Sequence, residues 1–285
     1  MTVRLPLRTP LGGLPYRQVT LLQGPSGWGE ISPLPGYPCA AGRARAAAEE
    51  AACGSWPAAG RDRIPVNAIV PAVAPDEAAA MAAGHTTVKV KVGDPGDVDR
   101  VAAVRAAIGP HGAIRVDANG VWDVDTALAT IARLAPYDLE MVEQPVATME
   151  DLASVRRRLT AAIPVAADEC VRSVADAVRL RQLEAADILV LKVQPLGGVA
   201  AAMAVAEAAG LPALVSSMFE SSVGLAAGVA LAAALPDLPY ACGLGSALLL
   251  GFDVVADPLV PVDGWLPVRR VAPDPELLDR FSVAV

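Results

Sequence analysis

The feature that most constrains the fold is a regular alternation of short apolar segments with alanine-rich segments between Val66 and Ala247. Short apolar strands that alternate with helices indicate parallel βαβ units. The eight predicted strands lie in VNAIVPAV, TTVKVKVG, AIRVDANG, LEMVEQPV, PVAADEC, DILVLKV, LPALVSS and PYACGLGS. No strand-to-helix turn carries G-x-G-x-x-G, so the pattern favours a closed (β/α)8 barrel over an open dinucleotide-binding sheet.

The segments on either side of this repeat have a different composition. Residues 1–62 are rich in glycine and proline and include one helical stretch, AAGRARAAAEEAACG. The same glycine and proline pattern resumes after the last predicted strand, in VVADPLVPVDGWLPV. We therefore expect a small α+β capping domain formed by residues 1–62 and 256–285, with the barrel in residues 63–255.

Charge and hydropathy exclude several classes of partner. The 23 basic and 31 acidic residues give a formal net charge of −8, which argues against a nucleic-acid or anionic membrane surface. The longest apolar run, Val223–Leu235, is shorter than the ~18–20 residues that span a bilayer, and it predicts a buried helix. The four cysteines form no C-x-x-C pair, and no signal peptide is evident. We expect a soluble cytoplasmic protein with unpaired thiols.

Charged side chains stand near the ends of strands that should otherwise be apolar. Those from the third to the sixth strand follow Lys91 at steps of 24 to 26 residues, and the same step leads on to Ser217 and Cys242–Gly243. The carboxyl ends of barrel strands are where catalytic groups are presented. The members of the set are Lys89, Lys91, Asp117, Glu143, Asp168 and Lys192.

This set predicts a chemistry. Asp117, Glu143 and Asp168 would repel one another strongly in a half-buried site unless a cation lay among them. Ligands that are all oxygen, with no histidine or cysteine nearby, favour Mg²⁺. The second and sixth strands lie opposite each other in an eight-stranded ring, so Lys91 and Lys192 should face each other across a metal-bound ligand. The neighbouring ammonium of Lys89, with the cation, should lower the pKa of Lys91 toward that of a useful base.

Other polar residues are interpreted more conservatively. Arg115 and Asn119 share the face of Asp117 and are candidate substrate-binding residues. Any one strand carboxylate, taken alone, is more often a salt-bridge or capping residue than a metal ligand. We expect His85 and His111 at the surface and Glu169 in the outer packing, because it should point away from Asp168. Glu50 and Glu220 are interpreted as solvated or capping charges.

The motifs KVKVG, RVDANG, VEQPV, ADEC and LKVQPLGG, in this order, resemble the enolase superfamily, specifically its muconate-lactonizing subgroup. The resemblance implies a modified TIM barrel with a capping domain, K-x-K lysines on the second strand and a lysine on the sixth. It also implies Mg²⁺ ligands on the third to fifth strands. Members of the superfamily remove a proton next to a carboxylate. Cys170 departs from the serine that often follows Asp-Glu in the subgroup.

Within the subgroup, LKVQPLGG, VSSMFESSVGLAAG and CGLGSALLLGFDVV are similar to the actinobacterial o-succinylbenzoate synthase family of menaquinone biosynthesis. This resemblance implies syn dehydration of 2-succinyl-6-hydroxy-2,4-cyclohexadiene-1-carboxylate. Lys91 would remove the α-proton and return it to the departing hydroxyl, and Lys192 would stabilise the anion. Ser216, Ser217 and Gly243 would lie near the carboxylate arms of the substrate. Arg115 would pair either with one of those carboxylates or with a neighbouring strand.

Several alternatives remain open at this point. N-succinylamino acid racemase uses the same lysines, and muconate cycloisomerase is a further possibility. A dipeptide epimerase is disfavoured, because CGLGS offers no acid where such enzymes carry Asp-x-Asp. A barrel that only binds its ligand is the alternative from a different class. The sequence leaves open the oligomeric state, the ratio of dehydratase to racemase activity, the carboxylate-binding residues, and the closing loop, sought within residues 27–37.

Overall fold

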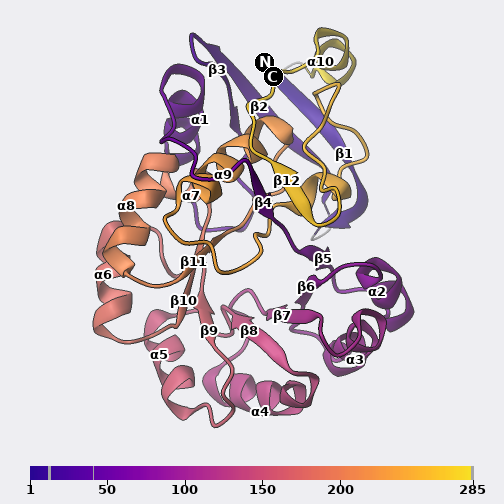
Figure 1. Ribbon diagram of the computed structural model, residues 1–285, viewed down its shortest axis with the longest axis vertical. Helices are drawn as coiled ribbons and strands as arrows, with labels where there is room; N and C mark the ends of the chain where they lie inside the picture. Colours follow the sequence, from indigo (N-terminus) through magenta and orange to yellow (C-terminus); the bar gives the residue numbers. More distant parts are fainter. Residues whose placement is uncertain (12–13, 41, 284–285) are drawn as a thin grey trace. The chain divides into compact units, whose positions relative to one another are not determined.

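The structure is a computed structural model that describes residues 1–11, 14–40 and 42–283 of the chain. It divides into two compact units (Figure 1). The first unit comprises Met1–Pro65, Leu191–Ala204 and Val215–Val285, and the second comprises Val66–Val190 and Val205–Leu214.

The first unit opens with an antiparallel sheet whose strands are β1 (Thr2–Leu11), β2 (Leu14–Gly24) and β3 (Gly27–Ile31). Alternating apolar residues give this sheet one buried face, as expected for strands with the other face in water. Helix α1 (Arg43–Cys53) buries a row of alanines. A Cβ atom at Gly29 would lie 2.0 Å from the carbonyl oxygen of Ala48, so glycine is required where α1 lies against β3.

The C-terminal segment returns to this same unit. Strand β12 (Trp265–Pro267) pairs antiparallel with β4 (Arg63–Pro65), and Ser282 forms a bridge with Val3. Helix α10 (Pro275–Phe281) contributes Leu278 to the core cluster that contains Val3. Both ends of the chain therefore share one core. The predicted capping-domain boundaries, 1–62 with 256–285, stay a prediction.

The remaining elements of the first unit are mostly helical. They are α7 (Val193–Leu196), α9 (Ser222–Ala234) and the 3-10 helix η2 (Gly245–Leu249). Helix α9 is buried along nearly its whole length, which confirms the buried helix predicted from the apolar run at Val223–Leu235. Among the residues that the structure describes, no helix is long and apolar enough to cross a membrane.

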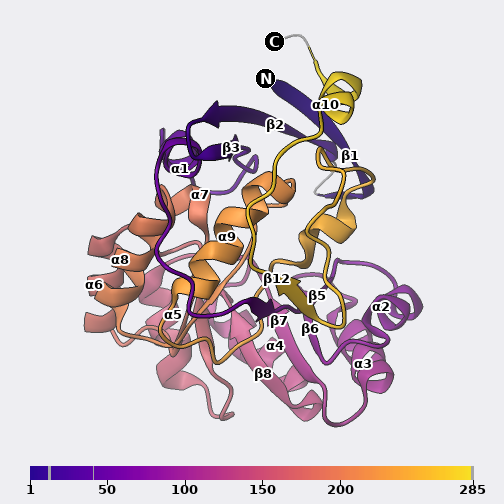
Figure 2. The same cartoon turned by 45° about the horizontal axis from the view of Figure 1, so that its top comes forward.

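The second unit is built on a parallel sheet whose strands follow one another in chain order (Figure 1), and its first four strands are also labelled in Figure 2. The last residues of β10 and β11, and residues 199–204 at the start of the helix between them, fall in the first unit. The strands are β5 (Ala68–Val70), β6 (Thr87–Lys91), β7 (Ala113–Asp117), β8 (Leu139–Glu143), β9 (Val165–Ala167), β10 (Ile188–Leu191) and β11 (Ala213–Val215). The intervening helices are α2 (Pro75–Ala82), α3 (Asp97–Ile108), α4 (Val124–Leu134), η1 (Ala135–Tyr137), α5 (Met149–Arg158), α6 (Val174–Gln182) and α8 (Val199–Ala209). The predicted α/β class is confirmed.

Strand register explains the regular spacing of the charged residues. Lys91 on β6 pairs with Asp117 on β7, which pairs in turn with Glu143 on β8. Each repeat of one strand, one helix and two connections therefore brings the next charged residue to the same level of the sheet. On β9 the partner of Glu143 is Ala166, so Asp168 lies two residues further along, beyond the end of its strand.

The eighth predicted strand is much shorter than expected. In the described part of PYACGLGS the chain forms bridges instead of a strand of the sheet. Within the first unit, the N–H of Cys242 donates to the carbonyl of Pro65, and the N–H of Gly243 donates to that of Val215, each at 2.8 Å. Pro239, Gly243 and Gly245 disfavour a longer ladder, because proline lacks an N–H and glycine weakens a strand.

Candidate active site

Four charged side chains meet at the carboxyl ends of β6, β7 and β8. The Nζ atom of Lys89 lies 3.0 Å from Asp117 Oδ2 and 2.9 Å from Glu143 Oε1. The Nζ atom of Lys91 lies 2.6 Å from the same Asp117 oxygen. Two of the three predicted lysines and two of the three predicted acids therefore form one cluster, in which both ammonium groups share a single carboxylate oxygen.

Because the cluster is buried, each of its charges depends strongly on the others. Asp117 and Glu143 are 1% and 0% exposed, and Lys89 is 5% exposed, whereas a quarter of the Lys91 side chain remains accessible. An unpaired charge at such depth costs several kcal/mol, so removal of one member leaves the others poorly compensated. Lys91 is the cluster member with access to solvent, and hence the member that a small molecule can reach.

Asn119 connects the cluster to Glu169, a residue that was predicted to lie in the outer packing. Its Oδ1 accepts a hydrogen bond from Lys91 Nζ at 2.7 Å, and its Nδ2 donates to Glu169 Oε1 at 2.8 Å. The prediction that Glu169 belongs to the outer packing is therefore wrong. Because β9 ends at Ala167, the alternation of side chains along the strand does not continue to Glu169. The other carboxylate oxygen of Glu169 is buried without a hydrogen-bond partner among the described residues.

The third predicted acid, Asp168, is held by its backbone at a buried turn. Its N–H donates to Gln144 Oε1 at 2.8 Å, and the N–H of Cys170 donates to the same oxygen at 3.4 Å. Gln144 is fully buried and adopts a left-handed backbone conformation with φ of 37°. Burial raises the pKa of the Cys170 thiol to about 12, which leaves it protonated and unreactive.

Arg115 forms an ion pair within the sheet. Its guanidinium bonds to the carboxylate of Glu140 on the neighbouring strand β8, and Nη1 donates to Asn67 Oδ1 at 3.3 Å. The side chain is almost completely buried. Of the two roles considered for Arg115, the structure therefore shows the pairing with a neighbouring strand.

In the first unit, Lys192 directly precedes α7 and is 7% exposed. Its Nζ atom lies 4.3 Å from the centre of the Tyr37 ring, a distance at which a cation and an aromatic face attract each other. Tyr37 lies in the segment that follows β3, within the range where we expected a closing loop. The structure thus gives Lys192 an aromatic neighbour that the sequence analysis did not identify.

The predicted small residues of the first unit also come together. The N–H of Ser216 donates to the carbonyl of Leu191 at 2.8 Å, and that of Ser217 donates to the carbonyl of Gly243 at 3.1 Å. A Cβ atom at Gly243 would lie 2.6 Å from Ser216 Oγ, so a side chain at this position would displace the serine hydroxyl. Both serines are less than 10% exposed.

Glu50 has one of its predicted roles, whereas Glu220 does not have the predicted exposure. Glu50 accepts hydrogen bonds from the N–H groups of Val199 and Ala200 at the start of α8, which is the capping role that was considered. Glu220 is 4% exposed, so its interpretation as a solvated charge is wrong. Its carboxylate accepts from the N–H of Met218 at 2.6 Å, and burial raises its pKa. His85 is partly exposed and His111 exposed, as expected.

The donor chemistry of the cluster fits a divalent metal ion. Asp117 and Glu143 already share a cation, the ammonium of Lys89, and oxygen-only donors suit Mg²⁺. In the described ranges, however, no three Asp, Glu, His or Cys side chains are gathered closely enough to enclose a metal.

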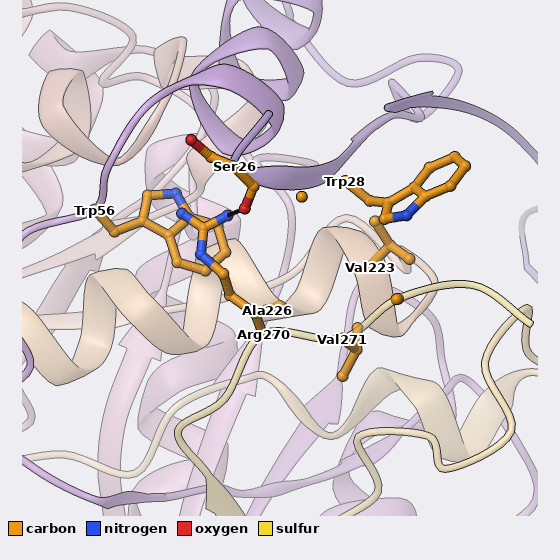
Figure 3. Close-up of a pocket in the computed structure, with 9 residues that line it drawn as sticks. Ser26, Trp28, Trp56, Val223, Ala226, Arg270 and Val271 are labelled. Atoms are coloured by element: carbon orange, nitrogen blue, oxygen red, sulfur yellow. Dashed lines mark hydrogen bonds between the residues drawn. The ribbon is translucent and has the colours of Figure 1, made fainter. Parts of the chain in front are cut away.

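The first unit contains a hollow of about 220 Å³ that is lined by none of the predicted site residues (Figure 3). Trp28, Trp56, Val223 and Arg270 are among its lining residues, and the guanidinium of Arg270 stacks on the Trp56 ring at 3.8 Å. Nη1 of Arg270 donates to the carbonyls of Ser26 and Ala51. These bonds tie the C-terminal segment to the turn before β3 and to the end of α1.

A compositional signal could have strengthened the sequence prediction. Lys89, Lys91 and Lys192 are the only lysines in the chain, whose other basic residues are all arginine apart from two histidines. By contrast, Gln144, Asn67 and Glu169 carry no periodic signal, because they lie before a strand or after its end.

Comparison with known proteins places the chain in a family. The model for the enolase C-terminal domain-like family matches residues 74–273, and that for the enolase N-terminal domain-like family matches residues 2–52. The chain belongs to the enolase superfamily. Its fold is the α/β TIM-type barrel of that superfamily with a small N-terminal capping domain.

Individual relatives narrow this further. The chain is 57% identical to an o-succinylbenzoate synthase of Thermobifida fusca (strain YX), over 94% of this chain and 86% of the relative. It is 47% identical to an o-succinylbenzoate synthase of Mycobacterium leprae (strain TN), over 98% of this chain and 85% of that protein. Among solved structures it resembles 2-chloromuconate cycloisomerase from Rhodococcus opacus 1CP, with a TM-score of 0.86, 26% identity and coverage of 99% and 98%.

Proposed function

We propose that this protein is an o-succinylbenzoate synthase, a lyase that dehydrates 2-succinyl-6-hydroxy-2,4-cyclohexadiene-1-carboxylate to 2-succinylbenzoate. The observation that carries the proposal is the accessible Lys91 ammonium, held between Asp117 and Asn119, in a chain that is 57% identical to an enzyme of this name. We further propose a cytoplasmic enzyme of menaquinone biosynthesis that acts on a small carboxylate.

Lys91 is the proposed base. In its neutral form Nζ accepts the proton from the carbon next to the substrate carboxylate, and the C–H electron pair delocalises onto that carboxylate, from which it returns to form the new ring double bond as the hydroxyl departs. The ammonium so formed then delivers this proton to the hydroxyl that departs from the same face. One water leaves and the ring becomes aromatic, so no external oxidant or reductant is needed. Asp117 and Asn119 fix Nζ at 2.6 and 2.7 Å, which limits the orientations the amine can adopt.

Lys192 is the proposed electrostatic partner. Its buried ammonium would stabilise the delocalised anion, because a fixed cation in a poorly solvated site interacts strongly with developing negative charge. The Tyr37 ring beside Nζ restricts the lysine without neutralising it. Ser216, Ser217 and Gly243 would lie near a carboxylate arm of the substrate, to which the serine hydroxyls would donate, because the backbone N–H groups of these residues already bond within the fold.

We propose that Asp117, Glu143 and Asp168 hold Mg²⁺. When bound there, the ion would supply electrostatic stabilisation for negative charge that develops on the substrate carboxylate. The ammonium of Lys89, which shares Asp117 Oδ2 with Lys91, keeps a second positive charge beside the proposed base.

The test is a spectrophotometric assay with the cyclohexadiene carboxylate, in which loss of diene absorbance is followed with Mg²⁺ and with EDTA. Metal-dependent loss that disappears in Lys91→Ala supports the proposal. Absence of loss, together with α-proton exchange of N-succinyl amino acids in D₂O, would move the function to racemisation. Absence of both activities would contradict the proposal and favour a barrel that binds its ligand without chemistry.

A further inference from the structure

A chain of buried hydrogen bonds connects β3 to the segment that carries Lys192. The N–H of Ser32 donates to Gln194 Oε1 at 2.8 Å, and Gln194 Nε2 donates to Ser32 Oγ at 2.9 Å. Ser32 Oγ donates in turn to Glu30 Oε1 at 2.5 Å. All three residues are at most 3% exposed. Gln194 lies two residues after Lys192, so this double contact fixes the backbone that orients the lysine.

The same glutamate reaches a second segment of the site. Glu30 accepts hydrogen bonds from the N–H of Ser221 at 3.2 Å, from the hydroxyl of Ser221, and from the N–H of Gly224 at 3.1 Å. A Cβ atom at Gly224 would lie 3.0 Å from the Glu30 carboxyl carbon, so glycine permits this approach. Glu30 therefore holds the start of α9 and the turn that leads to it from Ser217.

Arg17 on β2 holds the middle of that turn. Its Nη2 donates to the carbonyls of Ser32 and Met218 at 2.5 and 3.2 Å, and its Nε donates to the carbonyl of Phe219 at 3.3 Å. Phe219 has a φ of 59°, a left-handed conformation that a bulky residue rarely adopts. A strained turn of this kind persists only where surrounding contacts fix it, and Arg17 supplies those contacts.

We propose that Arg17, Glu30 and Ser32 are positioning residues for catalysis: through Gln194 they orient Lys192, and through residues 218–221 they orient Ser216 and Ser217. The proposal rests on the proposed function, because that function gives Lys192 and the two serines their roles. It makes the N-terminal sheet part of the catalytic apparatus, although all three residues are buried.

Stability alone does not account for this network. Glu30 lies near two further buried acids, Glu220 and Asp253; Arg17 interacts with both Glu30 and Glu220, and Lys192 also interacts with Glu220. Burial raises the pKa of Glu30 to about 7 and raises those of Glu220 and Asp253 as well. Apolar side chains of similar volume often stabilise a core better than such groups. The hydrogen bonds add a fixed geometry of the segments that they join.

The three lysines of the chain allow a direct test in the intact protein. Selective ¹³C labelling at lysine Cε gives three side-chain signals, which Lys→Arg variants assign. In Ser32→Ala we expect the Lys192 signal to move, because the ammonium shifts relative to the Tyr37 ring, while the Lys89 and Lys91 signals stay in place. We expect kcat to fall about tenfold with little change in KM. Ser32→Thr, which keeps the hydroxyl, should restore both.

Two further variants keep the test decisive. Gln194→Met breaks the same link from the other side and replaces Ser32→Ala if that variant does not fold. Ser246→Ala removes a buried hydroxyl that has no hydrogen-bond partner among the described residues, so it controls for loss of packing. A Lys192 signal that stays in place in folded Ser32→Ala and Gln194→Met, or that moves equally in Ser246→Ala, would overturn the proposal. A Lys192 signal that moves in an enzyme without dehydratase activity would overturn the proposed function and leave the positioning intact.

Discussion

The carboxylates of the lysine cluster and the carboxylate of Glu30 are all buried, but they have different kinds of partner. Asp117 and Glu143 contact lysine ammonium groups directly. Glu30 accepts hydrogen bonds from serine hydroxyls and backbone N–H groups, and its burial raises its pKa to about 7. The first arrangement stabilises the charged carboxylate, whereas the second leaves it close to protonation at neutral pH.

This difference separates chemistry from positioning. A lysine side chain is flexible and can move away, so carboxylates paired with lysine can exchange one cation for another. Backbone N–H groups and hydroxyls on fixed turns cannot leave, so Glu30 stays where the fold places it. The lysine cluster is therefore suited to binding and proton transfer, and the network around Glu30 is suited to holding other groups still.

The largest expected effect comes from the exposed member of the cluster. Replacement of Lys91 by alanine removes the proposed base, and we expect kcat to fall by at least ~10³-fold. The fold should persist, because Asp117 keeps its contact with Lys89. Steady-state kinetics with circular dichroism as the check on folding measures both.

Lys91→Arg is the matched control for charge. Arginine keeps the positive charge beside Asp117 but cannot lose its proton at neutral pH. It should therefore be as inactive as Lys91→Ala. An arginine variant with more than about 1% of the wild-type kcat would show that Lys91 acts by charge and not as a base.

The second expected effect concerns the metal. Asp117→Asn keeps the shape of the side chain but removes a negative charge from the proposed ligand set, so we expect Mg²⁺ to activate at least ~10-fold more weakly. Titration with Mn²⁺, followed by electron paramagnetic resonance, measures binding independently of turnover. Glu140→Gln serves as the control, because Glu140 pairs with Arg115 and is not a proposed ligand. Equal Mn²⁺ affinity in Asp117→Asn and the wild type would contradict the metal site.

Most of the fold was predictable because it repeats. Each predicted strand from the first to the seventh contains an observed strand, and the steps between Lys91, Asp117 and Glu143 correspond to paired positions in the sheet. The length of the eighth strand was overestimated. Its apolar residues indicated a full strand, whereas Pro239 and Gly243 limit its pairing. The repeat could not indicate that residues 191–204 belong with the N-terminal sheet.

The candidate site was predictable only where it follows the strand period. The strand period correctly predicted that Lys89, Lys91, Asp117 and Glu143 lie together, whereas Glu169 was misplaced because the strand stops before it. The contacts of Glu30 with Ser221 and of Ser32 with Gln194 join residues more than 150 positions apart. No local pattern encodes such contacts, so Glu220 in the same region was also misjudged as solvated.

A third expected effect, on stability instead of turnover, tests the network through pH. Because the pKa of Glu30 is raised from 4.5 to about 7 in the folded state, its contribution to stability is full below pH 4.5 and is lost as the pH rises through 7. The loss is of the order of 3 kcal/mol, and Glu30→Gln should remove that part of the slope. Urea unfolding at pH 5 and pH 8 measures it, with exposed Glu49→Gln as the control. Glu220 and Asp253, whose pKa values are also raised, should preserve a residual slope. An unchanged slope in Glu30→Gln would show that Glu30 is already ionised well below neutral pH, and the contrast with the lysine cluster would then fail.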